Sequence, residues 1–402
     1  MSTVVGALEV ADIFRLYGAE FRRRNLARLA RAQLRVMSAI EKCRTAALGG
    51  HLWQCDRCGA QKISYNSCRN RHCPKCQSLD KERWLEKRRS ELLPVPYFHL
   101  VFTLPHELNA FALTHSQWLY DLLFRCACET LLEIAADSKH LGAHIGMLAV
   151  LHTWSQKLTL HPHLHCIVAG GGISVHGPCW VWSRKRFFLP VRVLARLFRG
   201  KVLAELKSAY HAGGLNLQGS LLAYQNKGVF ADLLSSLYAH RWVVYSKPPF
   251  GGPDQVLAYL ARYTHRVAIT NHRLRRLEND QVVFHWKDYA HGGEKREMSL
   301  PAEEFIRRFL LHVLPDRFVR IRYYGLLANR HRKENLELCR KLLRHRTVPK
   351  SLLTAEPSWQ DLAQKLTGID PMLCPECGQG RLQALQTLPP LRDHQHPGRP
   401  PP

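Results

Sequence analysis

The chain has 402 residues, with 58 lysines and arginines against 32 aspartates and glutamates, so its formal charge is +26 at neutral pH. Such an excess favours a polyanionic partner, either DNA or RNA. The composition argues against a membrane or secreted protein, because no uncharged stretch approaches a membrane-spanning length and the 13 cysteines cluster with histidines. We therefore expect a cytoplasmic protein that does not contact a membrane.

The first predicted elements are helices over residues 10–46, followed by a cysteine-rich segment. In that segment Cys55-x2-Cys58 and Cys73-x2-Cys76 are separated by fourteen residues. Paired knuckles at this spacing can place four thiolates tetrahedrally around zinc. The sequence therefore predicts a structural Zn²⁺ site made of Cys55, Cys58, Cys73 and Cys76.

The number of zinc ions stays open at this point. Four further ligand-type side chains lie in or just before the segment: Cys43, His51, Cys68 and His72. A second zinc or an exchanged ligand is compatible with this spacing. Arg69 and Arg71 lie among these cysteines, where we expect them to bind DNA phosphates.

Residues 84–93 predict a charged helix that Pro94 and Pro96 terminate. The chain then alternates between strand-like and helix-like patterns. The predicted strands cover residues 97–103, 146–154, 164–168 and 241–246, and the predicted helices cover residues 106–136, 191–210 and 253–266. These patterns by themselves predict only a mixed α and β protein.

Histidines recur at every second position in His161-Pro162-His163-Leu164-His165. In an extended strand, side chains two apart share a face, so the three imidazoles would point one way and Leu164 into a core. This pattern predicts a metal site on one strand. Buried hydrogen-bonded histidines and a structural zinc site are the alternatives.

Two tyrosines, Tyr259 and Tyr263, lie one turn apart on the predicted helix 253–266. Taken alone, their apolar stripe is more typical of a core. Beside a histidine metal site, however, a tyrosine hydroxyl can attack a polarised phosphodiester. The chain lacks a G-x-x-x-x-G-K-[ST] phosphate loop, which agrees with transesterification that needs no nucleotide.

These residues resemble the two-tyrosine HUH endonucleases, and among them the rolling-circle transposases of the insertion-sequence-91 type. The histidine, hydrophobic, histidine signature falls on His163-Leu164-His165, and the paired tyrosines fall on Tyr259 and Tyr263. Further similar blocks cover residues 154–158, 170–172, 266–269 and 320–325. The resemblance extends over about residues 10–335.

The resemblance implies an α+β fold. A helical, zinc-knuckle module (residues 1–93) would bind DNA and precede an HUH catalytic domain (residues 94–335), an antiparallel split βαβ sheet flanked by helices. Residues 336–402 would form a basic tail with a disordered end. The tail contains Cys374-x2-Cys377, half of a zinc knuckle. His394 and His396 could complete a site with it, but their spacing is loose, so a C-terminal zinc stays open.

The implied function is a DNA transposase that nicks and joins single-stranded DNA at insertion-sequence ends through 5′-phosphotyrosine intermediates. Tyr259 and Tyr263 would be catalytic, and His163, His165 and His161 would bind Mg²⁺ or Mn²⁺. Host replication machinery would extend the free 3′-OH in rolling-circle replicative transposition, with the protein at the bacterial nucleoid through DNA. Lys157, Arg262 and Arg266 are expected to bind DNA near this site.

Three rival functions stay open. A plasmid rolling-circle replication initiator or relaxase of the HUH class would share the histidine strand and the tyrosines. A metal-independent tyrosine recombinase would resist a chelator. A non-catalytic zinc DNA-binding protein would bind DNA without cutting it. The sequence predicts neither the DNA ends, nor the order of the tyrosines, nor the oligomeric state.

Overall fold

The computed structural model describes residues 8–89, 91–250, 255–256, 259, 267–343 and 358–391. The chain divides into two compact units, each built from segments that are distant in the sequence. The first unit comprises Met1–Trp84, His265–Val313 and Ala355–Pro402, and the second comprises Leu85–Thr264 and Leu314–Thr354. Helices accompany sheets whose paired strands are antiparallel, so the expected α+β class is confirmed.

The second unit is built on a five-stranded antiparallel sheet of order β13-β5-β6-β3-β9. Its strands are β3 (Tyr97–Thr103), β5 (Gly146–Trp154), β6 (Leu160–Ala169), β9 (Val244–Phe250) and β13 (Ile321–Gly325). A smaller sheet contains β4 (Ala143–His144), β7 (Gly171–Ser174) and β8 (Trp180–Trp182). The helices of this unit are η3 (His106–Leu108), α4 (Asn109–Thr114), α5 (Ser116–Ala136), α6 (Val191–His211), η4 (Gly219–Gln225), α7 (Lys227–Ala239) and α10 (Arg332–Leu342).

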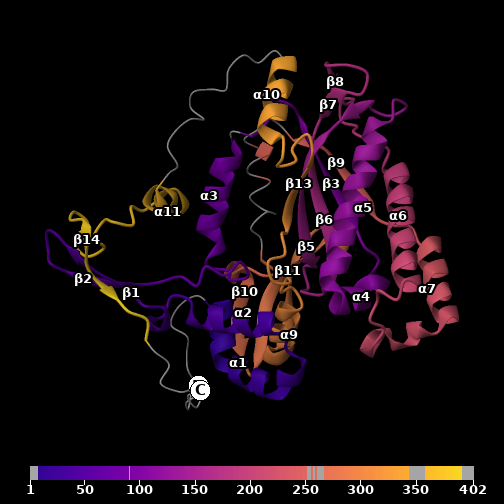
Figure 1. The fold of residues 1–402 in the computed structure, drawn as a ribbon. Coiled ribbons are helices and arrows are strands. Elements are labelled where there is room, and N and C mark those ends of the chain that lie inside the picture. The colour runs from indigo at the N-terminus through magenta and orange to yellow at the C-terminus, as the bar shows by residue number, and fades with distance from the viewer. Residues whose placement is uncertain are drawn as a thin grey trace, which may run out of the picture. The chain divides into compact units, whose positions relative to one another are not determined.

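The core of the second unit lies between one face of this sheet and its helices. Figure 1 shows α5 and α6 side by side along the sheet, and both contact its strands. Alternate residues of β6, beginning with the fully buried Leu164, enter this core, as do Leu100 and Phe102 of β3. Because side chains alternate along a strand, the intervening residues of β3, β5 and β6 belong to the opposite face. The predicted placement of Leu164 in the core is confirmed.

The first unit begins with two helices and a hairpin. Its elements are α1 (Val10–Asn25), η1 (Leu26–Arg28), α2 (Arg31–Lys42), η2 (Ala46–Leu48), β1 (Gly50–Cys55), β2 (Gln61–Tyr65), α3 (Gln77–Arg89), η5 (Asn271–Arg273), β10 (Leu274–Glu278), β11 (Gln281–Asp288), η6 (Tyr289–His291), β12 (Glu294–Pro301), α9 (Ala302–Leu310), α11 (Trp359–Thr367) and β14 (Leu382–Leu388). The boundary between the units falls within α3.

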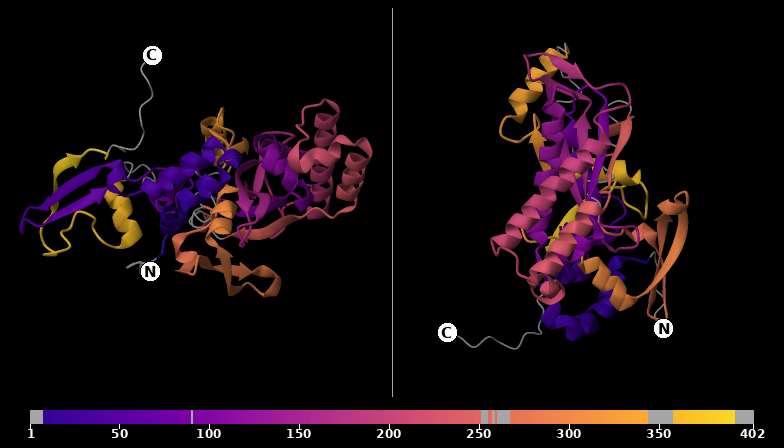
Figure 2. Two further views of the ribbon diagram at one scale, coloured as in Figure 1. Left: turned by 90° about the horizontal axis from the view of Figure 1, so that it is seen from below. Right: turned by 90° about the vertical axis from the view of Figure 1, so that its right-hand side faces the viewer.

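Contacts far apart in sequence assemble the first unit. Phe14 of α1 packs edge-on against Phe309 of α9, with ring centroids 5.3 Å apart. The side chain of Gln33 donates a hydrogen bond of 3.0 Å to the backbone oxygen of Leu310. At the other side of the unit, β14 pairs antiparallel with β1 over Gly50–Cys55, and Figure 2 shows the yellow β14 beside the violet hairpin. Segments from the middle and the end of the chain, His265–Val313 and Ala355–Pro402, thus belong to the same compact unit as the N-terminal residues. The three consecutive functional domains stay a prediction from the sequence.

Candidate active site and zinc centres

Three imidazoles gather on the face of the sheet opposite the core. β6 contributes His163 and His165, and the neighbouring strand β5 contributes His152, which lies directly opposite His163 in the register. Their ligand nitrogens all lie within 4.8 Å of one another. Nitrogens bound at about 2.1 Å to one ion are at most about 4.2 Å apart, so a small adjustment lets one ion bind all three. We call His152, His163 and His165 the histidine cluster.

The ring of His163 is oriented for metal binding. Its Nδ1 lies 2.7 Å from the backbone oxygen of His161, and because a carbonyl oxygen only accepts hydrogen bonds, Nδ1 carries the proton. The lone pair of the neutral ring is therefore on Nε2. This arrangement is typical of metal-binding histidines, whose second ring nitrogen is held by a hydrogen bond.

His161 does not belong to the histidine cluster, although the sequence predicted it as the third ligand. The pairing of β5 with β6 shifts register after His152, so that Trp154 lies opposite Leu160. This irregularity leaves His161 exposed at the end of its strand, with its ring 5.1 Å from that of His163. The structure brings His152 to the cluster instead.

A fourth histidine links the cluster to a tyrosine. His99 of β3 lies on the same face as His165, and its Nε2 is 2.8 Å from Nδ1 of His165. The hydroxyl oxygen of Tyr259 lies 2.6 Å from the other ring nitrogen, Nδ1 of His99. Burial, followed by the nearby charges of Lys247 and His163, lowers the pKa of His99 to about 3, so the ring is neutral.

Neither His99 nor His152 was among the site residues predicted from the sequence. Each lies in a segment predicted as a strand, at a position that alternates with buried aliphatic or aromatic residues. The useful signal would have been a histidine on the non-core face of a strand that pairs with β6, the strand of His163 and His165. This signal requires the order of the strands in the sheet, which the sequence patterns do not give.

The other residues expected at this site fall in two places. Lys157 is exposed in the turn between β5 and β6. Tyr263, Arg262 and Arg266 lie outside the described residues.

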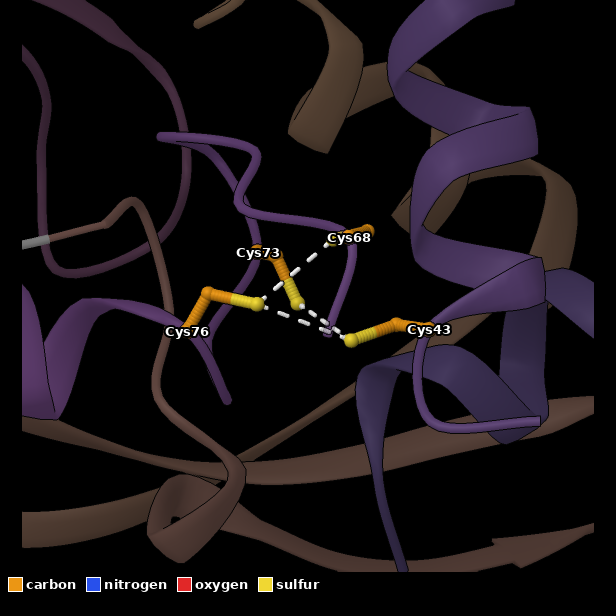
Figure 3. Close-up of side chains that lie close together, drawn as sticks. All are labelled: Cys43, Cys68, Cys73 and Cys76. Atoms are coloured by element: carbon orange, nitrogen blue, oxygen red, sulfur yellow. Dashed lines mark hydrogen bonds between the residues drawn. The ribbon is translucent and has the colours of Figure 1, made fainter. Parts of the chain in front are cut away.

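The first cysteine cluster consists of Cys43, Cys68, Cys73 and Cys76 (Figure 3). Cys43 follows α2, and the other three precede α3. The sulfurs of Cys43 and Cys68 each lie 3.6 Å from that of Cys76, and Cys73 lies 3.7 Å from Cys43. A zinc ion with four bonds of about 2.3 Å in tetrahedral geometry requires sulfurs about 3.8 Å apart. The spacing therefore fits a four-thiolate zinc site.

The four cysteines expected to share one zinc are divided between two clusters. Cys73 and Cys76 belong to the first cysteine cluster, whereas Cys55 and Cys58 lie with Cys374 and Cys377. The hairpin of β1 and β2 explains the division, because Cys55 and Cys58 lie at its tip and the other two lie beyond its base. Four paired steps of about 3.4 Å separate tip from base by on the order of 14 Å, too far for one metal shell.

The arginines expected to bind DNA lie in the loop of the first cysteine cluster. Arg69 is exposed and follows Cys68 directly, whereas Arg71 is half-buried. The basic side chain of Lys75 in the same loop forms an ion pair of 2.5 Å with Glu9. Arg69 is therefore the better placed of these three to meet a phosphate.

Comparison with known proteins identifies the class of protein. Residues 146–335 match the family described as "Putative transposase", and residues 13–104 match the family described as "Transposase zinc-binding domain". A Sinorhizobium fredii protein named "Putative transposase y4qJ" is 52% identical over 378 residues, covering 94% of this chain and 95% of the relative. The "Transposase for insertion sequence element IS801" of Pseudomonas savastanoi pv. phaseolicola is 27% identical over 352 residues, covering 86% and 82%. No solved structure matches the chain.

The two domains and the extent of these alignments define a transposase with a zinc-binding domain. A transposase acts on DNA and transfers its strands, which agrees with the positive charge of the chain. The chain belongs to the insertion-sequence-91 family of transposases. Its zinc-binding domain and cysteine clusters support structural Zn²⁺. Among the described residues, no helix has the length and apolarity needed to cross a membrane.

Proposed function

We propose that this transposase nicks and joins single-stranded DNA at insertion-sequence ends through 5′-phosphotyrosine intermediates, in rolling-circle replicative transposition. Tyr259 and Tyr263 are the proposed nucleophiles. The observation that carries the proposal is the hydrogen-bonded series from the Tyr259 hydroxyl through His99 to His165, a member of the histidine cluster. A tyrosine that is hydrogen-bonded, through one histidine, to a metal-binding histidine lies close to the place where the metal would bind a phosphate. Its hydroxyl is therefore suited to attack that phosphate.

The proposed step is a transesterification. The Tyr259 oxygen forms a bond to the scissile phosphorus, and the bond from that phosphorus to the 3′ oxygen breaks. The hydroxyl proton passes to solvent, and the departing 3′ oxygen takes up a proton to become the free 3′-OH that host replication machinery extends. Because its pKa is about 3, His99 is a weak base, so we assign it to orienting the tyrosine oxygen.

The histidine cluster is proposed to hold the divalent ion, with His152 in the role first expected for His161. When bound, this ion polarises the scissile phosphate. Three imidazole donors suit Mn²⁺ better than Mg²⁺, which prefers oxygen ligands, so Mn²⁺ is the ion of choice for a first experiment.

The DNA contacts proposed for the described residues come from one exposed side chain in each unit. Lys157 lies in the turn at the end of the histidine strand, and Arg69 lies beside Cys68 in the zinc-binding loop. Long cationic side chains in exposed loops are suited to phosphates. Arg71, Arg262 and Arg266 stay DNA-binding predictions from the sequence.

The test is covalent adduct formation. Purified protein is incubated with Mn²⁺ and single-stranded oligonucleotides from the flanks of its own gene, and adducts are resolved on a denaturing gel. We expect the wild type to form an adduct, and Tyr259→Phe, His163→Ala and added chelator to abolish it. Tyr289→Phe is the matched control, because this exposed tyrosine of η6 belongs to the other unit.

The rival functions give different outcomes. An adduct that survives the chelator would indicate a metal-independent tyrosine recombinase. Salt-sensitive DNA binding without an adduct on any flank would indicate a non-catalytic DNA-binding protein. Cleavage of a plasmid origin but of no element end would indicate a replication initiator or relaxase. Tyr263→Phe and the double variant test which tyrosine cuts first.

A further inference from the structure

We propose that Cys55, Cys58, Cys374 and Cys377 bind a second structural zinc ion, which fastens the C-terminal segment of residues 358–391 to the N-terminal hairpin. We call these four residues the composite cluster. Cys374 and Cys377 lie outside residues 13–104, the part of the chain that matches the zinc-binding family. The proposed site therefore takes two of its four ligands from outside the region that matches this family.

The sulfurs of the composite cluster are spaced as a zinc ion requires. The sulfur of Cys55 lies 3.8 Å from that of Cys377, and the sulfur of Cys58 lies 3.7 Å from that of Cys374. All four lie within 4.8 Å of one another. Tetrahedral zinc with four thiolates requires about 3.8 Å, so the geometry fits the metal.

The two halves of the composite cluster have the same local structure. Each Cys-x2-Cys pair is followed by a glycine in the left-handed region, Gly59 at φ +73° and Gly378 at φ +63°. Gly59 donates its backbone N–H to the Cys55 oxygen at 3.1 Å, and Gly378 donates to the Cys374 oxygen at 2.9 Å. This shared turn is expected for two zinc knuckles that bind one ion, and it is not expected for two unrelated pairs of cysteines.

Backbone amides also point at the sulfurs, as thiolate ligands require. The N–H of Arg57 lies 3.4 Å from the sulfur of Cys55, and the N–H of Gly380 lies 3.3 Å from the sulfur of Cys377. Hydrogen bonds to the charged form favour a thiolate. They hold the sulfurs in the chemical state in which zinc binds them.

The apolar packing around the composite cluster is slight. Its buried residues are Cys55, Cys374 and Leu382, with Trp53, Ala60, Met372 and Cys377 partly buried against them. All residues of β14 between Gln383 and Thr387 are exposed. Leu382 is the one aliphatic side chain among the buried members of this cluster, and so small a core cannot stabilise such a module alone. Small modules of this kind depend on a metal. Zinc binding would thus supply most of the free energy that holds β14 on β1.

The experiment measures zinc per chain in the full-length protein by mass spectrometry of the metal. Of the two cysteine-bound zinc ions, we expect Cys58→Ser to lose one relative to the wild type, Cys377→Ser to lose one, and the double variant to lose no more than one, because both cysteines serve one ion. Combining Cys58→Ser with Cys73→Ser should remove both ions, since these residues belong to different clusters. Cys179→Ser, at an exposed cysteine outside both clusters, is the matched control.

Two results would overturn the proposal. One is a Cys377→Ser variant that retains as much zinc as the wild type. The other is a Cys58→Ser, Cys73→Ser double variant that loses only one ion, which would restore a single site shared by the two N-terminal pairs. Both zinc measurements are made without DNA and do not depend on nicking activity. Their outcome is therefore independent of the proposed function.

A second measurement uses only the wild-type protein, so it tests the proposal even if the cysteine variants fail to fold. Native protein is alkylated with a thiol reagent before and after treatment with a chelator, and each cysteine is followed by peptide mass spectrometry. We expect Cys58 and Cys377 to be protected with zinc and to become reactive together, whereas Cys179 reacts in both states. Immediate reaction of Cys377 in the zinc-loaded protein would contradict the proposal.

Discussion

His99 joins the proposed nucleophile to the histidine cluster through a single neutral ring. A neutral imidazole has one N–H and one lone pair, so its two hydrogen bonds have a direction. If His165 binds the ion through Nε2, its Nδ1–H donates to Nε2 of His99. The N–H at Nδ1 of His99 then donates to the Tyr259 oxygen, which stabilises the negative charge that develops on it.

This series predicts that two replacements of His99 separate its two roles. An asparagine amide can take the place of Nδ1 and a glutamine amide that of Nε2. We expect His99→Asn to weaken Mn²⁺ binding by about 10-fold to 100-fold, as loss of a hydrogen bond to a metal ligand does, while adduct formation at saturating Mn²⁺ is retained. His99→Gln should keep the Mn²⁺ affinity and slow adduct formation.

Mn²⁺ binding is measured by electron paramagnetic resonance without DNA, and adduct formation by the denaturing gel. A merely structural role would affect both variants alike in both readings. Equal losses in His99→Asn and His99→Gln would therefore contradict the positioning role of His99.

The third ligand is the second prediction at the residue scale. His152→Ala should weaken Mn²⁺ binding far more than His161→Ala, because His152 belongs to the histidine cluster and His161 is exposed at the strand end. Titration of each purified variant with Mn²⁺ measures this. A larger loss in His161→Ala would return the third ligand to the residue that the strand pattern first predicted.

At the scale of elements, one face of β6 packs into the core and the other carries the histidines. Leu164 enters the core while the histidines on either side of it face away. Leu164→Ala should lower the free energy of unfolding by about 2–5 kcal/mol, from lost burial and the cavity that remains. Urea unfolding measures the change, with Leu222→Ala as the control, because Leu222 is 58% exposed. A loss below about 1 kcal/mol would show that this strand does not anchor the core.

Gly380 permits the close approach of the two knuckles. A Cβ at this position would collide with the sulfur of Cys55 and lie 2.8 Å from the Cβ of Arg57. Gly380→Ala should therefore remove the ion of the composite cluster and leave that of the first cysteine cluster. Zinc content measures this, and Gly177→Ala is the control, since a Cβ there meets no atom within 4 Å. Two retained ions in Gly380→Ala would contradict the packing.

At the scale of the whole molecule, the charge of +26 predicts the way DNA is bound. A protein that neutralises several phosphates releases their counterions, so affinity falls steeply with salt. For 6–10 phosphate contacts on single-stranded DNA we expect the affinity to fall by about 300-fold to 10⁴-fold between 50 and 200 mM salt. Fluorescence anisotropy with labelled single-stranded DNA measures the slope. A loss below tenfold would mean that the charge does not drive binding.

The sequence by itself determined the features that depend on neighbouring residues. The period of two in His163-Leu164-His165 predicted which side chain enters the core, because alternation is a property of any strand. The C-x2-C pairs predicted zinc knuckles in the same way, since the turn that holds two thiolates is local. Family membership followed from these motifs and is confirmed.

Only the tertiary structure decided which of these local features meet. His99 and His165 are 66 positions apart, and Cys58 and Cys374 are 316 positions apart. Strand order and register bring His152 and His99 to the histidine strand, and the pairing of β14 with β1 brings the C-terminal knuckle to Cys55 and Cys58. A motif specifies the geometry within its own turn or strand, but its partner depends on pairing between distant segments, which local periodicity does not encode.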